Sequence, residues 1–243
     1  MNKFAAVITM DTNCNRFQAF AENNKHLEFE IFKGMSGATM PRDHRIAAGF
    51  VTEEIADAPD LTDARLGIAL SHWSLWQAAI KRNSAVLIME DDVMTHPQIW
   101  SQIEAIPNLD EVDMVFFSAN TDTTMVITSP EGLTQASVFN PKNPHPDWIR
   151  TTLARTNAND VRYWRLSRAF GLCCYIVTPR GAQALSKSMF PLRGDGVYVP
   201  FISNLVMQCA VDHRMNAMYD ELNAYIAMPF LAYTPHHNEF APA

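Results

Sequence analysis

The sequence predicts an α/β fold, a single domain with a mostly parallel central sheet. Three observations indicate it: strand-like runs alternate with helix-like segments, one apolar run suits a strand covered on both faces, and the composition supplies a large core. Of the 243 residues, 48% are hydrophobic and 10% aromatic. This length lies within the range that α/β folds fill as one domain. We therefore expect residues 1–243 to form one unit.

The first segments read as strand, loop, helix and strand. Residues 5–10 form a short β-rich run, and the polar cluster 11–15 follows it. Residues 16–25 carry a helical pattern, and residues 27–32 alternate in polarity like a strand. This order is typical of the start of a parallel nucleotide-binding sheet.

The next part of the chain predicts loops, one long helix and a central strand. Residues 33–60 contain several Gly and Pro residues, which favours loops with at most a short helix. A helix then begins after Thr62 as N-cap and stops at Asn83. Its apolar residues lie on two sides, so we expect it to be buried on both. It leads into residues 85–89, a continuous apolar run typical of an interior parallel strand.

The second half continues the alternation with more loops. Residues 129–159 carry four Pro residues and predict a long excursion, which we interpret as an acceptor loop or lid. Thr178 caps a further helix that has Pro at its first position. We also expect a helix over 201–209 and a polar turn at 212–214. The remaining strand-like runs are residues 114–117, 125–128, 172–177 and 224–228.

Composition argues against a protein that binds nucleic acid or spans a membrane. With 26 acidic and 19 basic residues and a net charge of -7, the chain lacks the basic field that would attract nucleic acid or an anionic membrane. No segment approaches the roughly 20 apolar residues that cross a bilayer, and the N-terminal apolar run is too short for a signal peptide. We expect a cytoplasmic protein with at most peripheral membrane association. The four cysteines have neither zinc-knuckle nor disulfide spacing, which predicts buried free thiols.

The strongest local signal is Glu90-Asp91-Asp92, three successive carboxylates at the end of the run 85–89. Ligands of open α/β sheets gather beyond the carboxyl ends of the strands, and packed like charges repel unless a cation or hydrogen bonds offset them. Mn²⁺ or Mg²⁺ suits the position because it prefers oxygen ligands and leaves room for phosphate and water. If the extended geometry continues, Glu90 and Asp92 face the metal and Asp91 points away, as a supporting or sugar-binding residue.

These three residues alone also permit a plainer interpretation. The acidic triplet can be a solvated turn after a strand, with Asp92 as the cap of the next helix. The surrounding sequence favours the metal site. Residues 65–72 read RLGIALSH, residues 73–77 read WSLWQ and residues 87–93 read LIMEDDV.

This assembly resembles glycosyltransferase family 25, which includes bacterial lipopolysaccharide galactosyltransferases and the collagen galactosyltransferases. The family has an Ala-Leu-Ser-His helix leading into a strand that ends in Glu-Asp-Asp. Asp11 and Arg16 fall where the family has an Asn-Leu-Asp-Arg loop followed by an arginine, although residues 9–12 lack that wording. Residues 171–182 match a further block. Residues 211–213 resemble a Pro-Val-Asp motif, with Ala210 in place of the expected Pro.

The resemblance implies a glycosyltransferase A fold, the Rossmann-like fold of nucleotide-diphospho-sugar transferases. It implies inverting transfer of a hexose, most often galactose from UDP-galactose, to a hydroxyl of a glycan such as lipopolysaccharide. A divalent cation, a nucleotide-sugar donor and a saccharide acceptor are then the expected partners. The departing nucleoside diphosphate builds negative charge that the metal offsets, while a carboxylate base removes the acceptor's proton. Five residues are expected at the donor: Asp11, Arg16, Ser71, His72 and Asp91.

Other chemistry-bearing residues have more than one interpretation. We predict that Asp212 is the general base, although it can equally be a metal or sugar ligand or a helix cap. Asp195 competes for that role but suits a turn. His213 is an alternative ligand for metal or substrate, and without the resemblance His72 would read as a core histidine. His236 and His237 belong to a C-terminal segment that we expect to be a mobile tail.

Two alternatives come from other functional classes. The chain can be a nucleotide-sugar- or carbohydrate-binding module of the same fold that has lost turnover. A metal-dependent phosphohydrolase also uses clustered carboxylates near a strand end. The phosphohydrolase has less support, because no Asp-x-Asp nucleophile pair follows the first strand and no second His or Asp cluster has dinuclear spacing.

Overall fold

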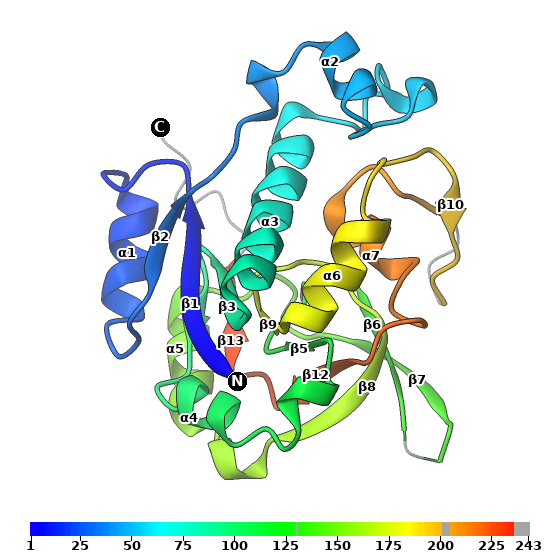
Figure 1. Cartoon of the computed structure of the whole chain (residues 1–243). Coiled ribbons are helices and arrows are strands. Elements are labelled where there is room, and N and C mark those ends of the chain that lie inside the picture. The colour runs from blue at the N-terminus through cyan, green and yellow to red at the C-terminus, as the bar shows by residue number, and fades with distance from the viewer. Residues whose placement is uncertain (130, 201–204, 236–243) are drawn as a thin grey trace.

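The computed structural model describes residues 1–129, 131–200 and 205–235, and its main feature is one large sheet (Figure 1). Within these residues nine strands pair in the order β2-β1-β3-β9-β5-β12-β8-β6-β7. They are β1 Asn2–Thr9, β2 Glu30–Lys33, β3 Ser84–Glu90, β5 Met114–Phe116, β6 Thr124–Thr128, β7 Thr134–Val138, β8 Arg162–Arg168, β9 Cys174–Val177 and β12 Ala224–Met228. Two small sheets pair β4 Met94–Thr95 with β13 Ala232–Tyr233, and β10 Gly196–Val197 with β11 Val206–Met207.

The sheet is mixed rather than uniformly parallel. The strands β2, β1 and β3 are parallel to one another, as are β5 and β12. The strand β9 lies between β3 and β5 and is antiparallel to both, while β8 and β7 also run against their neighbours. Six of the nine described strands therefore point the same way. The α/β class is confirmed, with a sheet that is mostly parallel in direction and mixed in pairing.

Helices cover both faces of the sheet. In the described residues they are α1 Asn15–Asn23, α2 Arg42–Ala47, α3 Asp63–Arg82, α4 Ile99–Glu104, α5 Pro146–Arg155, α6 Pro179–Ser188 and α7 Val211–Asn216. The helices α3 and α6 pack side by side on one face, and α7 contacts α3 there (Figure 1). The other face is covered by α1 and α4, whose Phe17, Phe20 and Ile103 belong to a second core cluster.

The strand β3 shows why the apolar run predicted an interior position. Val86 and Ile88 face the core under α3, whereas Leu87 and Met89 face the core under α1 and α4. Every residue of β3 before Glu90 is buried. Alternate side chains thus fill two separate cores, which is the reason for a continuous rather than alternating apolar pattern.

The long helix α3 begins and ends at the predicted residues. The Thr62 hydroxyl accepts a hydrogen bond from the Arg65 backbone N–H at 3.2 Å, and Asn83 ends the helix in the left-handed conformation with a φ of 47°. Leu66, Trp76 and seven further residues of the helix are buried, on more than one side. The prediction of a doubly buried helix is confirmed.

Several segments differ from prediction. Residues 129–159 hold β7 and α5 instead of a structureless excursion, because β7 pairs with β6 as a hairpin and Pro146 occupies the first turn of α5. The strand β8 was not predicted. Its residues RYWRLSR do not alternate between apolar and polar, and in the structure their burial does not alternate either. Of the helix expected over 201–209, residues 201–204 lie outside the described residues. The rest contains β11 and is not helical. The polar turn expected at 212–214 is part of the short helix α7.

Two further expectations concern cysteines and membranes. All four cysteines are free thiols, and three are buried, while Cys14 is half-buried and caps α1. Among the described residues, the helices are all too short or too polar to span a bilayer.

A close backbone crossing fixes the loop before α2 onto α3. The Ser71 hydroxyl donates to the Gly67 carbonyl at 2.8 Å and accepts from the Met35 N–H at 2.8 Å. A Cβ on Gly67 would lie only 2.4 Å from the Met35 carbonyl oxygen. Gly67 is therefore needed for close approach, although it lies inside a helix where alanine is normally preferred.

Replacing Gly67 with Ala changes the free energy of unfolding in opposite directions through helix propensity and through the clash with Met35. Helix propensity alone would stabilise the protein by about 1 kcal/mol, whereas the clash with Met35 should destabilise it by about 1–3 kcal/mol. We expect net destabilisation in urea unfolding. The adjacent exposed change Ile68→Ala is the control and should stay within about 0.5 kcal/mol of the parent. A stabilised Gly67→Ala protein would contradict the crossing.

Candidate active site at the carboxyl edge of the sheet

The acidic triplet lies where the parallel strands β1 and β3 end together. Ile8 of β1 is in register with Glu90 of β3, so Thr9 lies beside the start of the triplet. The chain turns at once, because the Val93 N–H donates to the Glu90 carbonyl at 3.2 Å. The carboxyl ends of parallel strands are where open α/β sheets bind ligands. The position of the triplet in the fold is as the sequence predicts.

Arg16 is the counterion of this acidic corner. Its Nε lies 2.5 Å from Asp91 Oδ1, and its Nη2 lies 3.4 Å from Asp92 Oδ2. The Thr9 hydroxyl donates to the other Asp91 oxygen at 2.6 Å in a buried hydrogen bond. Both aspartates are only 11% exposed at their side chains. The beginning of α1 and the end of β1 therefore hold Asp91 from two directions.

The pKa of Arg16 reports the combined field of the triplet. Burial alone would lower the pKa of this guanidinium, but the charges of Asp92, Asp91 and Glu90 together raise it above its usual value. One guanidinium thus faces three carboxylates. This concentration of negative charge at one place is what a divalent cation would be attracted to.

The side chains of the triplet do not alternate as an extended strand would place them. Glu90 keeps the strand geometry and lies on the α3 face, with its Oε1 3.6 Å from Nε2 of His72. Asp91 and Asp92 both contact Arg16, because the turn after Glu90 ends the alternation. The expectation that Glu90 and Asp92 point together and Asp91 away assumed extended backbone, which stops at Glu90.

His72 and Ser71 lie on α3 beside this corner. His72 is fully buried, and its Nδ1 lies 2.8 Å from the hydroxyl of Tyr175 on β9. Ser71 is also buried, and its hydroxyl is engaged with Gly67 and Met35 as described above. The structure places His72 beside Glu90, whereas Ser71 contacts the loop at Met35, and a contact of either residue with a donor stays a prediction.

Asp212 approaches the triplet through the segment that precedes β9. The Gly171 N–H donates to Asp212 Oδ2 at 3.1 Å, and the His213 N–H donates to Asp212 Oδ1 at 3.0 Å. Two residues further on, the Cys173 carbonyl accepts from the Glu90 N–H at 2.9 Å. Residues 171–173 therefore lie between Asp212 and Glu90, which brings together groups more than a hundred residues apart in the sequence.

The electrostatics of Cys173 agree with this arrangement. Burial raises the pKa of the Cys173 thiol well above its usual value, and the negative charges of Glu90 and Asp92 raise it further. Both carboxylates act on the same thiol. Cys173 is accordingly an unreactive thiol in the wall of the site rather than a nucleophile.

Asn120 joins the same wall and was missed by sequence reasoning. A Cβ on Gly171 would lie 1.8 Å from Asn120 Oδ1, and Gly171 has a φ of +79°, so only glycine fits there. The same Asn120 oxygen lies 3.7 Å from the Cys173 sulfur. The available signal was positional: Asn120 follows β5, whose carboxyl end meets the same edge of the sheet.

Three other candidate residues from the sequence make hydrogen bonds with residues outside the acidic triplet. Asp11 is exposed, and its carboxylate accepts from the Asn13 N–H in the loop before α1. His213 directs Nδ1 to the Met207 carbonyl and packs edge-on against Phe170. Asp195 accepts a hydrogen bond from Gln208 in the β10–β11 hairpin. His236 and His237 lie outside the described residues.

A complete metal cage is not present among the described residues, where no three His, Cys, Asp or Glu side chains are grouped to hold an ion. The donor chemistry nevertheless fits an open site. Magnesium-type sites in phosphate-transferring enzymes use one or two carboxylates and complete their coordination with substrate phosphates and water. Glu90, whose side chain is 26% exposed, and Asp92 are suited to that use.

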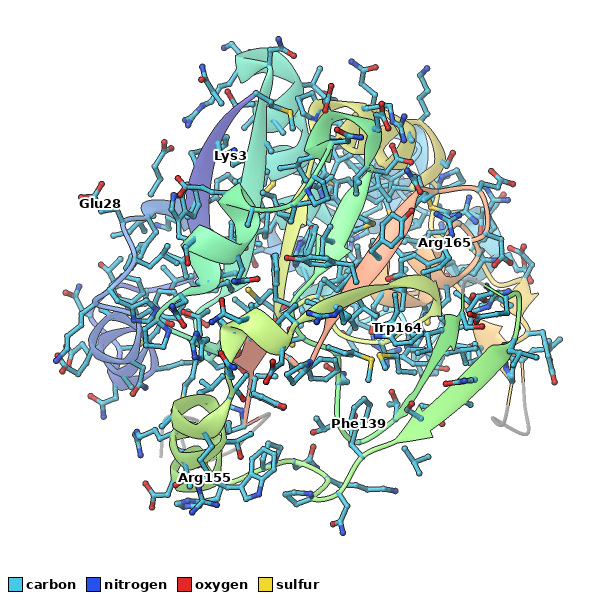
Figure 2. The ribbon with its side chains drawn as sticks, turned by 90° about the horizontal axis from the view of Figure 1, so that it is seen from below. Lys3, Glu28, Phe139, Arg155, Trp164 and Arg165 are labelled. Carbon is cyan, nitrogen blue, oxygen red and sulfur yellow. The ribbon has the colours of Figure 1, made fainter. Side chains whose placement is uncertain are left out.

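Two hollows lie at the opposite end of the sheet. One, of about 600 Å³, is lined by residues 3–5, 26–30 and Trp100. The other, of about 260 Å³, lies beside Asn83, just before β3. Figure 2 looks onto this end, with Lys3 and Glu28 labelled at its rim. Neither hollow contains a residue of the acidic corner.

The fold and the site define an α/β protein whose clustered carboxylates lie at the carboxyl ends of its parallel strands, the edge at which open α/β sheets bind ligands. The sequence model of glycosyltransferase family 25 (LPS biosynthesis protein) matches residues 3–202. The chain belongs to this family. The match includes Arg16, His72 and the triplet, whereas Asp212 lies beyond it.

The other comparisons add little. No curated protein sequence matches the chain. Among solved structures, the one titled "Crystal Structure of A197 from STIV" has 9% sequence identity and a TM-score of 0.43, covering 93% of this chain and 81% of that chain. A likeness of this size supports no statement about fold or function.

Replacing Thr9 with Val tests how the corner is held. The change keeps the shape of the side chain but removes the buried donor to Asp91, which should destabilise the protein by about 1.5–3 kcal/mol because the acceptor is ionised. Urea unfolding measures the effect. Thr39→Val, at an exposed position, is the matched control and should change stability by about 0.5 kcal/mol or less. Equal effects of the two changes would argue against a structural role for the Thr9 hydroxyl.

Proposed function

We propose that the chain is a metal-dependent inverting glycosyltransferase with a glycosyltransferase A fold. It transfers a hexose, galactose from UDP-galactose, to a hydroxyl of a glycan acceptor such as lipopolysaccharide, in the cytoplasm. The observation that carries the proposal is the acidic corner: three carboxylates at the end of β3 beside the Arg16 guanidinium, in a member of family 25.

The charges of the corner suit a nucleoside diphosphate bound with Mn²⁺ or Mg²⁺. Glu90 and Asp92 would hold the ion, which supplies Lewis-acid stabilisation of the departing diphosphate. Arg16 is long and 40% exposed, so its guanidinium can contact a phosphate while remaining close to Asp91. Asp91, fixed by Thr9, would keep Arg16 in place.

Asp212 is the proposed general base. Inversion requires the acceptor oxygen to attack the anomeric carbon from the face opposite the diphosphate, so the base must lie across the site from the metal. Asp212 comes from α7 and is linked to Glu90 through residues 171–173, since it accepts from the Gly171 N–H and Glu90 donates to the Cys173 carbonyl. Two backbone N–H groups, of Gly171 and His213, hold its carboxylate in one orientation.

The remaining predicted residues receive supporting roles. Asp11 and the loop before α1 would line the nucleotide, and Ser71 would keep the loop at Met35 against α3. The Nδ1 of His213 is hydrogen-bonded to the Met207 carbonyl. His213 is therefore less suited than its neighbour Asp212 to bind a metal ion. The alternative is a nucleotide-sugar- or carbohydrate-binding module of the same fold. Such a module would bind its ligand but would release no UDP and form no glycoside.

Substitution of Asp92 tests the metal assignment. In Asp92→Asn, Mn²⁺-dependent release of UDP from UDP-galactose should fall roughly 100-fold or more, since the ion loses a charged ligand. The assay is run with and without Mn²⁺, over a panel of UDP-sugars. Asp195→Asn, in the exposed hairpin, is the control and should retain parental release. Parental turnover in Asp92→Asn would remove the metal assignment.

Substitution of Asp212 tests the base. We expect Asp212→Asn to reduce transfer by roughly 10²–10⁴-fold, while UDP binding measured by calorimetry changes less than about threefold, because the donor contacts lie elsewhere. Asp212→Ala should show the same loss of transfer and the same retained UDP binding as Asp212→Asn. A parent protein that binds UDP-galactose but releases no UDP with any metal or acceptor would favour the binding module.

A further inference from the structure

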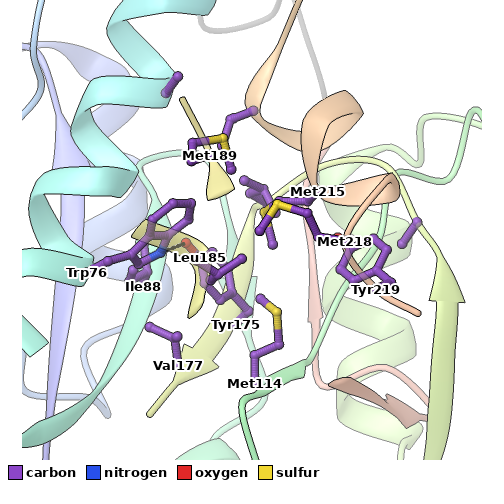
Figure 3. Close-up of a cluster of buried hydrophobic side chains, with 14 of the residues drawn as sticks. Trp76, Ile88, Met114, Tyr175, Val177, Leu185, Met189, Met215, Met218 and Tyr219 are labelled. Carbon is purple, nitrogen blue, oxygen red and sulfur yellow. Dashed lines mark hydrogen bonds between the residues drawn. The ribbon is translucent and has the colours of Figure 1, made fainter. Parts of the chain in front are cut away.

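A buried hydrogen-bonded chain runs from the core to the acidic corner. Tyr175 of β9 is fully buried, and its hydroxyl lies 2.9 Å from Nε1 of Trp76 and 2.8 Å from Nδ1 of His72. Figure 3 shows Trp76 and Tyr175 turned toward each other among buried side chains. His72 and Trp76 are four residues apart on α3, so both face Tyr175 from one side of the helix.

The donors and acceptors in this chain admit one consistent assignment. The indole N–H of Trp76 can only donate, so the Tyr175 oxygen accepts from it. The single proton of Tyr175 then has one available acceptor among the described residues, which is Nδ1 of His72. Burial raises the pKa of Tyr175 well above its usual value, so the hydroxyl keeps this proton. A proton on Nδ1 would instead leave the Tyr175 proton buried without an acceptor.

This assignment fixes where the proton of His72 lies. If Nδ1 accepts from Tyr175, the neutral ring carries its hydrogen on Nε2. That nitrogen is buried and has no hydrogen-bond partner among the described residues. The Glu90 carboxylate is close to this nitrogen: its Oε1 lies 3.6 Å away, which is too long for a hydrogen bond. The N–H of His72 therefore points toward the acidic corner.

The fold places the three groups in line for a physical reason. Tyr175 is in register with Ile88, and Glu90 lies two residues further along β3 on the same face. Stacking of the Tyr175 ring between His72 and Phe116 holds the hydroxyl in place. Hydrogen bonds thus link Trp76 and Tyr175 to His72, which is the residue beside Glu90.

We propose that Tyr175 is a positioning residue, which holds His72 with its proton on Nε2 so that this N–H orients the Glu90 carboxylate. The orientation of Glu90 rests on the proposed function, whereas the position of the proton on His72 does not. His72 accordingly presents an N–H to Glu90 from 3.6 Å and is neither a ligand of the metal nor a base. Trp76 donates to the Tyr175 oxygen, whose own proton is directed to Nδ1 of His72.

The first experiment reads the proton directly. Long-range ¹H–¹⁵N spectra of protein labelled with ¹⁵N-histidine distinguish a protonated ring nitrogen from a bare one, and a His72→Gln sample assigns the signals. We expect the protein without metal or donor to show His72 with Nε2 protonated and Nδ1 bare. A proton on Nδ1, alone or together with Nε2, would overturn the proposal.

Two matched core substitutions then test the role of Tyr175. Tyr175→Phe removes the hydroxyl, so His72 should lose its single tautomer, and the affinity for UDP with Mn²⁺ should fall about 10-fold by calorimetry. Trp76→Phe removes the other hydrogen bond to the same hydroxyl and should leave the His72 tautomer unchanged. Loss of the tautomer in Trp76→Phe but not in Tyr175→Phe would overturn the assignment.

The outcomes separate this inference from the proposed function. If Tyr175→Phe loses the tautomer yet binds UDP with Mn²⁺ like the parent, the orienting role is overturned and the proposed function stands. If the parent binds neither UDP nor Mn²⁺, the proposed function and the link to Glu90 fail together. The spectrum of the parent still decides the position of the proton in that case.

Discussion

The structure of the site depends on one electrostatic constraint: three carboxylates at the end of a buried strand must be neutralised. Arg16 meets part of it from the start of α1, and the Thr9 hydroxyl fixes Asp91 from the end of β1. Because parallel β1 and β3 end at the same edge, both partners come from the N-terminal strand and the helix that follows. This concentration of carboxylates is what makes a divalent cation and its diphosphate the proposed ligands.

The sheet supplies this corner with a second wall. The antiparallel strand β9 enters between β3 and β5, so the residues before it pass directly under the triplet. Gly171, in a conformation that favours glycine, lets Asn120 and Asp212 approach from two other elements. If β9 ran parallel to β3, the residues before it would lie at the opposite edge of the sheet.

Much of this could be predicted from the sequence. The helix between Thr62 and Asn83 and the strand before Glu90 carry strong, continuous patterns, and the triplet lies at the predicted edge. The pairing of β9 could not be predicted, because an apolar run on both faces has the same pattern in either direction. The contacts of Arg16 and Tyr175 depend on tertiary placement, and the sequence allowed either an extended strand or a turn at Asp91 and Asp92, which point in different directions in the two cases.

The central claim is that a divalent cation and a nucleoside diphosphate belong in the acidic corner. The most direct measurement is a crystal structure of the protein grown with Mn²⁺ and UDP, using the anomalous signal of manganese to locate the ion. The account predicts anomalous density at Glu90 and Asp92, bridged to the diphosphate, with Arg16 turned toward a phosphate. Bound UDP elsewhere, with Arg16 still seated on Asp91 and Asp92 and no manganese beside them, would contradict it.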